Sequence, residues 1–286
     1  MRAGGRALSV AVLVCSAFVG LVAAAQPAGA FSNTYAGAWA RPQGDGAWYV
    51  SSSGHVIARD AAPFLGDLTG RALARPIVGG TSTATGRGYW LVGSDGGVFS
   101  FGDAGFYGST GNRRLTQPVV GMVSTGSGKG YWLVASDGGV FAFGDAGFYG
   151  STGNKKLAQP IVGMARTHTS TGYWLVARDG GVFTFGNARF RGSVPGTGAQ
   201  VSSVAGMGVT PNDLGYWIVR GDGLVYHFGN ALSFLRYVAP RCDPVKTLVY
   251  NPVRQGYYLV LRSGAIRPQG SPPGRFRAIG TAQFRC

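Results

Sequence analysis

The sequence predicts an all-β protein, a six-bladed β-propeller made of six repeats of about 42 residues with four short strands each. The first observation is a repeated Gly-Tyr-Trp motif, of which the first and last copies are altered. The copies start 41 to 43 residues apart, at Gly46, Gly88, Gly130, Gly172, Gly215 and Gly256. The second is that each copy holds glycine-rich turns between short apolar runs, and no segment has a helical period. Repeats of this length with four strands are typical of propeller blades.

The first half of a unit is illustrated by the third copy. Residues 119–123 are a short apolar run that predicts a strand, and the small and polar residues 127–130 predict a turn. Residues 131–135 alternate aromatic and aliphatic side chains, as a strand between two packed layers does. The sequence therefore predicts an antiparallel strand pair that opens each unit.

The second half of the same unit begins with Ser136-Asp137-Gly138-Gly139. An Asp-Gly pair tolerates the positive backbone angles of tight hairpin turns. Residues 140–143 then predict a third strand, residues 144–147 a turn, and residues 148–150 a short fourth strand. The longest connection, residues 151–159, predicts the crossing to the next blade.

These elements predict one repeat domain over residues 31–286, with units at about 35–75, 76–117, 118–159, 160–200, 201–241 and 242–286. Residues 35–39 are either the innermost strand of the first blade or, with shifted boundaries, a strand that completes the last blade. An open β-solenoid is the alternative architecture, but such coils repeat faster and need polar caps. Closure into a ring would also remove exposed sheet edges.

The first thirty residues predict a signal peptide. Arg2 and Arg6 precede an apolar run, and Ala28-Gly29-Ala30 offers a small-residue cleavage site before Phe31. The run is almost long enough to span a bilayer, so an uncleaved anchor is the alternative, and a membrane is a partner only in that case. We therefore expect a secreted protein, extracellular or associated with the cell wall.

Two cysteines, Cys242 and Cys286, follow the export segment. In an exported protein such a pair favours a disulfide, with two free thiols as the alternative.

Residues 130–153, GYWLVASDGGVFAFGDAGFYGSTG, resemble the repeat of secreted proteins of actinobacteria and their relatives. In that family the repeat occurs alone or beside cell-wall amidases, peptidases and other exported enzymes. The resemblance covers residues 35–286 and implies a propeller-like exported module. It implies no settled activity and no catalytic residues.

The candidate catalytic groups do not converge. His55, His168 and His227 occupy unrelated repeat positions, whereas a zinc site or a Ser-His-Asp arrangement needs groups within reach of one another. The acids at shared positions precede tight turns and predict turn-forming side chains, with a ring of cation-binding carboxylates as the alternative; they are Asp95, Asp103, Asp137, Asp145, Asp179 and Asp222. We therefore expect no enzyme, metal or cofactor.

The charge points to binding instead. The chain carries 26 Lys and Arg, 11 acidic residues, all Asp, and a net charge of +15. We expect the binding face in the drifted, arginine-rich units at the two chain ends. The Tyr and Trp of the shared motif predict core, and the non-repeating Trp39 is a candidate for stacking on a sugar or partner. The candidate binding residues are Trp39, Arg241, Arg262, Arg267, Arg275, Arg277 and Arg285.

The expected function is a non-catalytic binding or scaffold module at the cell envelope, acting as a monomer. Its expected partner is an anionic wall polymer, a glycan or an envelope protein, because a basic surface attracts polyanions. Export disfavours nucleic acid. The alternatives are a positive charge that only aids solubility, a structural protein that binds copies of itself, and a glycan-acting propeller hydrolase with a channel site.

Overall fold

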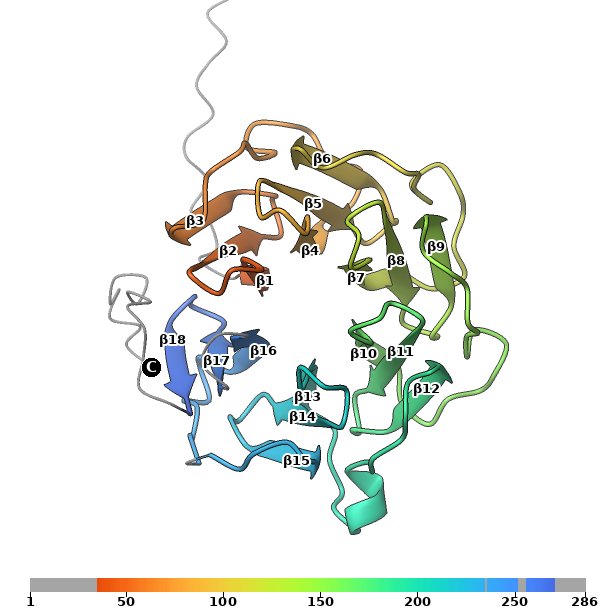
Figure 1. Cartoon of the computed structure of the whole chain (residues 1–286), viewed down its shortest axis with the longest axis vertical. Coiled ribbons are helices and arrows are strands. Elements are labelled where there is room, and N and C mark those ends of the chain that lie inside the picture. The colour runs from red at the N-terminus through yellow and green to blue at the C-terminus, as the bar shows by residue number, and fades with distance from the viewer. Residues whose placement is uncertain (1–34, 235, 252–255, 271–286) are drawn as a thin grey trace, which may run out of the picture. The chain divides into compact units, whose positions relative to one another are not determined.

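The computed structural model describes residues 35–234, 236–251 and 256–270. In it, eighteen strands form six separate three-stranded antiparallel sheets, which follow one another in chain order around a ring (Figure 1). The prediction of six blades is confirmed, and each sheet lies within one predicted unit. The inner, middle and outer strands of the successive blades are β1 (Tyr35–Ala40), β2 (Gly46–Ser51), β3 (Val56–Asp60), β4 (Ile77–Ser82), β5 (Gly88–Gly93), β6 (Val98–Gly102), β7 (Val119–Ser124), β8 (Gly130–Ala135), β9 (Val140–Gly144), β10 (Ile161–Arg166), β11 (Gly172–Ala177), β12 (Val182–Gly186), β13 (Val204–Val209), β14 (Gly215–Arg220), β15 (Val225–Gly229), β16 (Val245–Asn251), β17 (Gly256–Leu261) and β18 (Ile266–Gln269).

Backbone hydrogen bonds join each blade to the next around the whole ring. The first residue of an inner strand donates its N–H to the carbonyl that follows the preceding blade's middle strand: Val119 to Ser94 at 2.9 Å, Ile161 to Ser136 at 2.8 Å. Tyr35 donates to Arg262 at 3.2 Å in the same way, so blade six is bonded to blade one. This bond closes the ring and excludes the open solenoid. Because β1 pairs with β2, residues 35–39 belong to the first blade.

The core lies between neighbouring blades, and the shared aromatic motif forms it. Trp132 and Tyr131 have no exposed surface, and Trp132 packs against Tyr173 of the next blade with ring centroids 5.8 Å apart. Each motif Trp also donates its Nε1–H to a carbonyl of the connection that follows its blade, Trp132 to Gly147 at 2.7 Å. The prediction that these aromatics are core is confirmed.

The prediction of a fourth strand in each unit is wrong. Residues 148–150 form no strand, because their backbone groups bond to the next blade rather than to β9. Tyr149 donates its N–H to the Tyr173 hydroxyl at 3.2 Å, and that hydroxyl donates to the Gly150 carbonyl at 2.6 Å. The segment therefore connects two blades and leaves the outer strand as an edge.

Several expectations lie outside the described residues: the signal peptide at residues 1–30, Arg275, Arg277, Arg285 and Cys286. The bridge between Cys242 and Cys286 therefore stays a prediction. In the part of the chain that the structure describes, no helix is long and apolar enough to cross a membrane. The only helical element there is a short 3₁₀ turn, Pro195–Thr197.

Candidate binding site

The repeated acids form turns, as the sequence predicts. Asp137 Oδ1 accepts the N–H of Gly139 at 2.9 Å, and Asp95 and Asp179 do the same in their own blades. Asp145 accepts hydrogen bonds from the hydroxyls of Thr125 and Ser127 in the facing turn. These carboxylates are therefore engaged in local structure.

The two units that carry serine in place of the turn aspartate recruit an acid from elsewhere. Asp243 accepts hydrogen bonds from the Ser263 N–H at 2.7 Å and its hydroxyl at 2.6 Å. In blade one, Asp67 Oδ2 lies 2.8 Å from His55 Nδ1. Burial raises the pKa of Asp67, but hydrogen bonds from Thr69, His55 and Val56 outweigh it, so its pKa lies below the ordinary value. The drifted copies thus restore the turn with different residues.

The other unshared acids and histidines also do not converge. Asp45 pairs with Arg41 at 2.8 Å, and Asp213 accepts the backbone N–H of His168. His227 lies in β15. Among the described residues, no group of three His, Cys, Asp or Glu side chains could hold a metal ion.

Trp39 is not an open stacking platform, which corrects the prediction. It is 8% exposed and packs with Trp48, at 6.2 Å between ring centroids, and with Tyr89 of blade two, at 5.9 Å. Its ring lies over Gly80 of β4, where a side chain would collide with it. Its side chain therefore belongs to the core between blades one and two.

One repeated aromatic, by contrast, is exposed, and the sequence reasoning missed it. At the same position of the first four interblade connections a phenylalanine is 58 to 62% exposed; these are Phe64, Phe106, Phe148 and Phe190. Unit five has Ser233 there. The sequence does contain a signal for this difference. The phenylalanine position changes to serine in unit five, which a buried aromatic position would not tolerate as readily.

We expect Phe148→Ser to change stability little. Its side chain is 62% exposed, and unit five already carries serine at this position. The free energy of unfolding should stay within about 0.5 kcal/mol of the unmodified protein, as for most surface substitutions. Urea unfolding followed by circular dichroism measures it, and a loss of more than about 2 kcal/mol would show that this residue is part of the core.

The bases are concentrated on one side of the ring. We call crossover face the side that carries the turns between middle and outer strands and the ends of the interblade connections. Its bases are Arg71, Arg75, Arg113, Arg114, Lys155, Lys156, Arg178, Arg220, Arg241, Lys246 and Arg262, all exposed except the half-buried Arg220. Its acids are the turn-forming Asp67, Asp95, Asp137, Asp179, Asp222 and Asp243.

The opposite side is balanced. We call hairpin face the side that carries the turns between inner and middle strands. With the ends of the outer strands that adjoin these turns, its described bases include Arg41, Arg59, Arg87, Lys129, Arg166 and Arg189, and its described acids include Asp45, Asp60, Asp103, Asp145 and Asp213. The positive charge of the described part of the ring therefore lies mainly on the crossover face. The predicted binding residues Arg241 and Arg262 lie on this face, whereas Arg267 lies on the outer strand β18.

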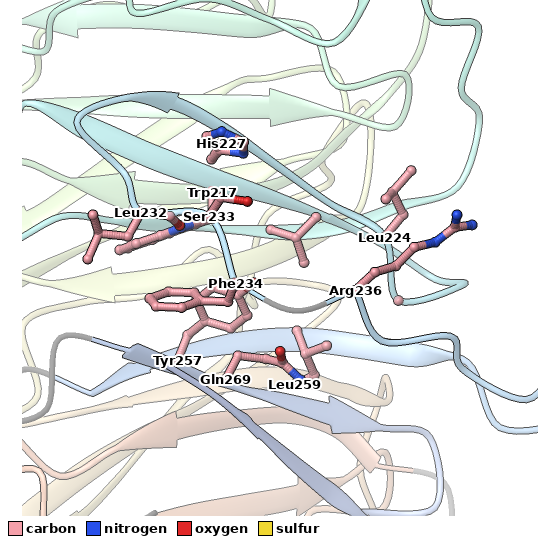
Figure 2. A pocket seen from close by; sticks show the side chains of 12 residues that line it. Trp217, Leu224, His227, Leu232, Ser233, Phe234, Arg236, Tyr257, Leu259 and Gln269 are labelled. Carbon is pink, nitrogen blue, oxygen red and sulfur yellow. The ribbon is translucent and has the colours of Figure 1, made fainter. Parts of the chain in front are cut away.

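A cavity of about 160 Å³ lies between blades five and six (Figure 2). Its aromatic residues are Trp217, Phe234 and Tyr257; Trp217 stacks on Phe234 with ring centroids 6.4 Å apart. The aliphatic part of the wall includes Leu224 and Leu259. A larger hollow, about 370 Å³, lies on the hairpin-face side of Trp217, with Tyr250 stacked on the indole.

The smaller cavity coincides with a departure from the repeat. Blades two to five carry a phenylalanine on the outer strand opposite the motif Tyr, as Phe185 lies opposite Tyr173 with rings 5.6 Å apart. In blade six Gln269 takes this position opposite Tyr257. A glutamine has less volume than a phenyl ring and brings a polar amide to the cavity wall.

One guanidinium group lines this cavity, and a second arginine lies on the adjacent strand β18. Arg236 lines it, where units two to four carry serine. Arg267 is two residues from Gln269 on β18 and therefore on the same face of the strand. Its guanidinium carbon lies 5.8 Å from the centre of the Tyr237 ring. Burial raises the pKa of Tyr257 to about 12, so its hydroxyl is neutral at physiological pH.

Comparison with known proteins shows the fold alone. No family model and no curated protein matches the chain. Among solved structures, the chain is similar to the crystal structure of the β-propeller domain of Cps50 (Swd1) from Myceliophteria thermophila, with a TM-score of 0.53 and 13% identity. The match covers 84% of this chain and 96% of that domain.

Proposed function

We propose that this β-propeller is an exported, non-catalytic binding module that holds an anionic polymer or acidic partner of the cell envelope on its crossover face. The observation that carries the proposal is the distribution of charge. Most crossover-face bases are exposed, while the carboxylates of that face are occupied in turns. A surface of one sign attracts polyanions and accelerates their encounter.

The predicted N-terminal export signal and the repeat resemblance support the cell envelope as the location. The proposal needs no catalytic group, which agrees with the local roles of Asp45, Asp67, Asp213 and Asp243. A glycosidase would need two carboxyl groups flanking one bond. No geometry described above favours such a pair, so we propose no hydrolytic activity.

Three double variants with the same change in net charge test the proposal. Arg241→Glu with Arg262→Glu changes the crossover face of blades five and six, Arg113→Glu with Arg114→Glu changes the same face between blades two and three, and Arg87→Glu with Lys129→Glu changes the hairpin face. We expect the first pair to weaken binding to an anionic wall-polymer fraction by about tenfold or more at low salt. The Arg113 and Arg114 pair should weaken binding less, and the Arg87 and Lys129 pair should weaken it least.

Binding should also weaken as ionic strength rises, because exposed charges are screened beyond about 8 Å at 0.15 M salt. Retention on immobilised wall polymer across a salt series measures both effects. Equal losses in all three variants would contradict a binding face, and equal losses in the first two would place it all around the crossover face. Retention that resists salt would contradict the electrostatic proposal altogether.

A further inference from the structure

We infer that the cavity between blades five and six is a docking pocket for one aromatic side chain of an acidic protein segment. The inference rests on the proposed function, since it names one partner class for a basic envelope module. It assigns that partner to a specific place beside β15 and β18 (Figure 2).

The size and lining of the cavity favour an aromatic group. Its volume is about 160 Å³, close to the roughly 150 Å³ of an engineered apolar cavity that binds benzene. Trp217, Phe234 and Tyr257 form its aromatic wall, and Leu224 and Leu259 add aliphatic surface. The lining also includes polar side chains, those of His227, Ser233, Arg236 and Gln269. A sugar ring would still place hydroxyl groups against the aromatic wall, where unpaired polar groups are costly.

The charge around the cavity favours acidic residues beside that aromatic group. Arg236 is exposed and lines the cavity, and none of the lining residues is acidic. Arg267 adds a second exposed guanidinium on the Gln269 face of β18. Asp222, in the turn beside Leu224, is already paired with Arg220 at 2.8 Å. An aromatic anchor in a pocket, surrounded by complementary charges, is a frequent centre of protein interfaces.

The other blades carry different residues at the positions of Arg236 and Gln269. At the same repeat positions, blades two to four carry serine where Arg236 lies, and blades two to five carry phenylalanine where Gln269 lies. The aromatic ring that blades two to five carry at this position is thus missing beside the added cation. Both changes favour the same ligand, an apolar ring next to carboxylates.

Short peptides added to the full-length protein test this inference. The probes are Asp-Phe-Asp, Asp-Ala-Asp and Asn-Phe-Asn, each blocked at both ends, and the readout is the NMR shift of the Trp217 indole N–H, which bonds to the Leu232 carbonyl at 2.8 Å. We expect Asp-Phe-Asp to bind saturably. Asp-Ala-Asp should bind at least about tenfold more weakly, because burial of a phenyl side chain has at least that effect.

Two variants separate the apolar and the ionic contributions to peptide binding. Gln269→Phe restores the ring of blades two to five and should abolish the shift, with the fold of the variant checked by circular dichroism. Arg236→Ser, at an exposed position, should weaken Asp-Phe-Asp but leave Asn-Phe-Asn unchanged. Unchanged Asp-Phe-Asp binding in either variant would overturn the inference.

An acidic oligosaccharide that shifts the same indole, and loses this effect in Gln269→Phe, would show that the pocket takes a glycan instead and would also overturn it. The Arg241→Glu and Arg262→Glu variant should still bind Asp-Phe-Asp. Failure of the crossover-face proposal is therefore distinguishable from failure of the pocket.

Discussion

Trp132→Ala should lower the free energy of unfolding by about 3–5 kcal/mol, the usual cost of truncating a buried aromatic residue. Trp132 is fully buried in β8 and packs against Tyr173 of blade four. Its Nε1–H also bonds to the Gly147 carbonyl at 2.7 Å, and alanine removes that donor. Chemical denaturation followed by circular dichroism measures the loss, which we expect to lower the unfolding midpoint without changing the fold.

The matched control is Trp132→Phe, which keeps an aromatic ring but not the donor. Its expected loss is smaller than that of the alanine variant. Equal losses would show that the hydrogen bond to Gly147 dominates, and a loss below about 1 kcal/mol for alanine would contradict an interblade core built on the Trp motif.

Gly138→Ala should destabilise the protein by about 2–5 kcal/mol, the sum of two effects. Gly138 has φ +78°, where a Cβ atom costs about 1–2 kcal/mol. An added Cβ would also overlap the hydroxyl of Thr152, which is 1% exposed and bonded to the Asp137 carbonyl at 3.1 Å. Relieving such an overlap in a packed site costs about 1–3 kcal/mol more.

Gly70→Ala is the control for the backbone effect alone. Gly70 has the same φ, +78°, but an added Cβ would meet no atom within 4 Å. We expect a loss of about 1–2 kcal/mol. Thermal unfolding of both variants separates the two contributions, and equal shifts in melting temperature would show that Thr152 moves aside without cost.

The compensating acids Asp67 and Asp243 show why part of the site was predictable and part was not. The sequence marks the positions where the turn aspartate is lost, Ser53 and Ser263, because the other copies serve as a reference. The acid that replaces it comes from another loop: Asp243 lies 20 residues from Ser263 in the chain. Only folding brings such residues together.

The sequence by itself determined the number of blades, the turns and the buried motif aromatics. These features depend on local patterns that recur every 41 to 43 residues, so each copy confirms the others. The excess of bases in residues 201–286, ten Lys and Arg against three Asp, was likewise visible as composition.

The tertiary structure alone decided features that depend on contacts between units. Residues 148–150 have the composition of a strand, but the Tyr173 hydroxyl of the next blade occupies their backbone groups. Trp39 looks like a free aromatic residue in the sequence, but β4 covers it, and the cavity at Gln269 lies where two drifted units meet. The sequence pattern indicates which segments favour a strand conformation. Whether a given side chain is buried depends on which neighbouring residues the closed ring places against it.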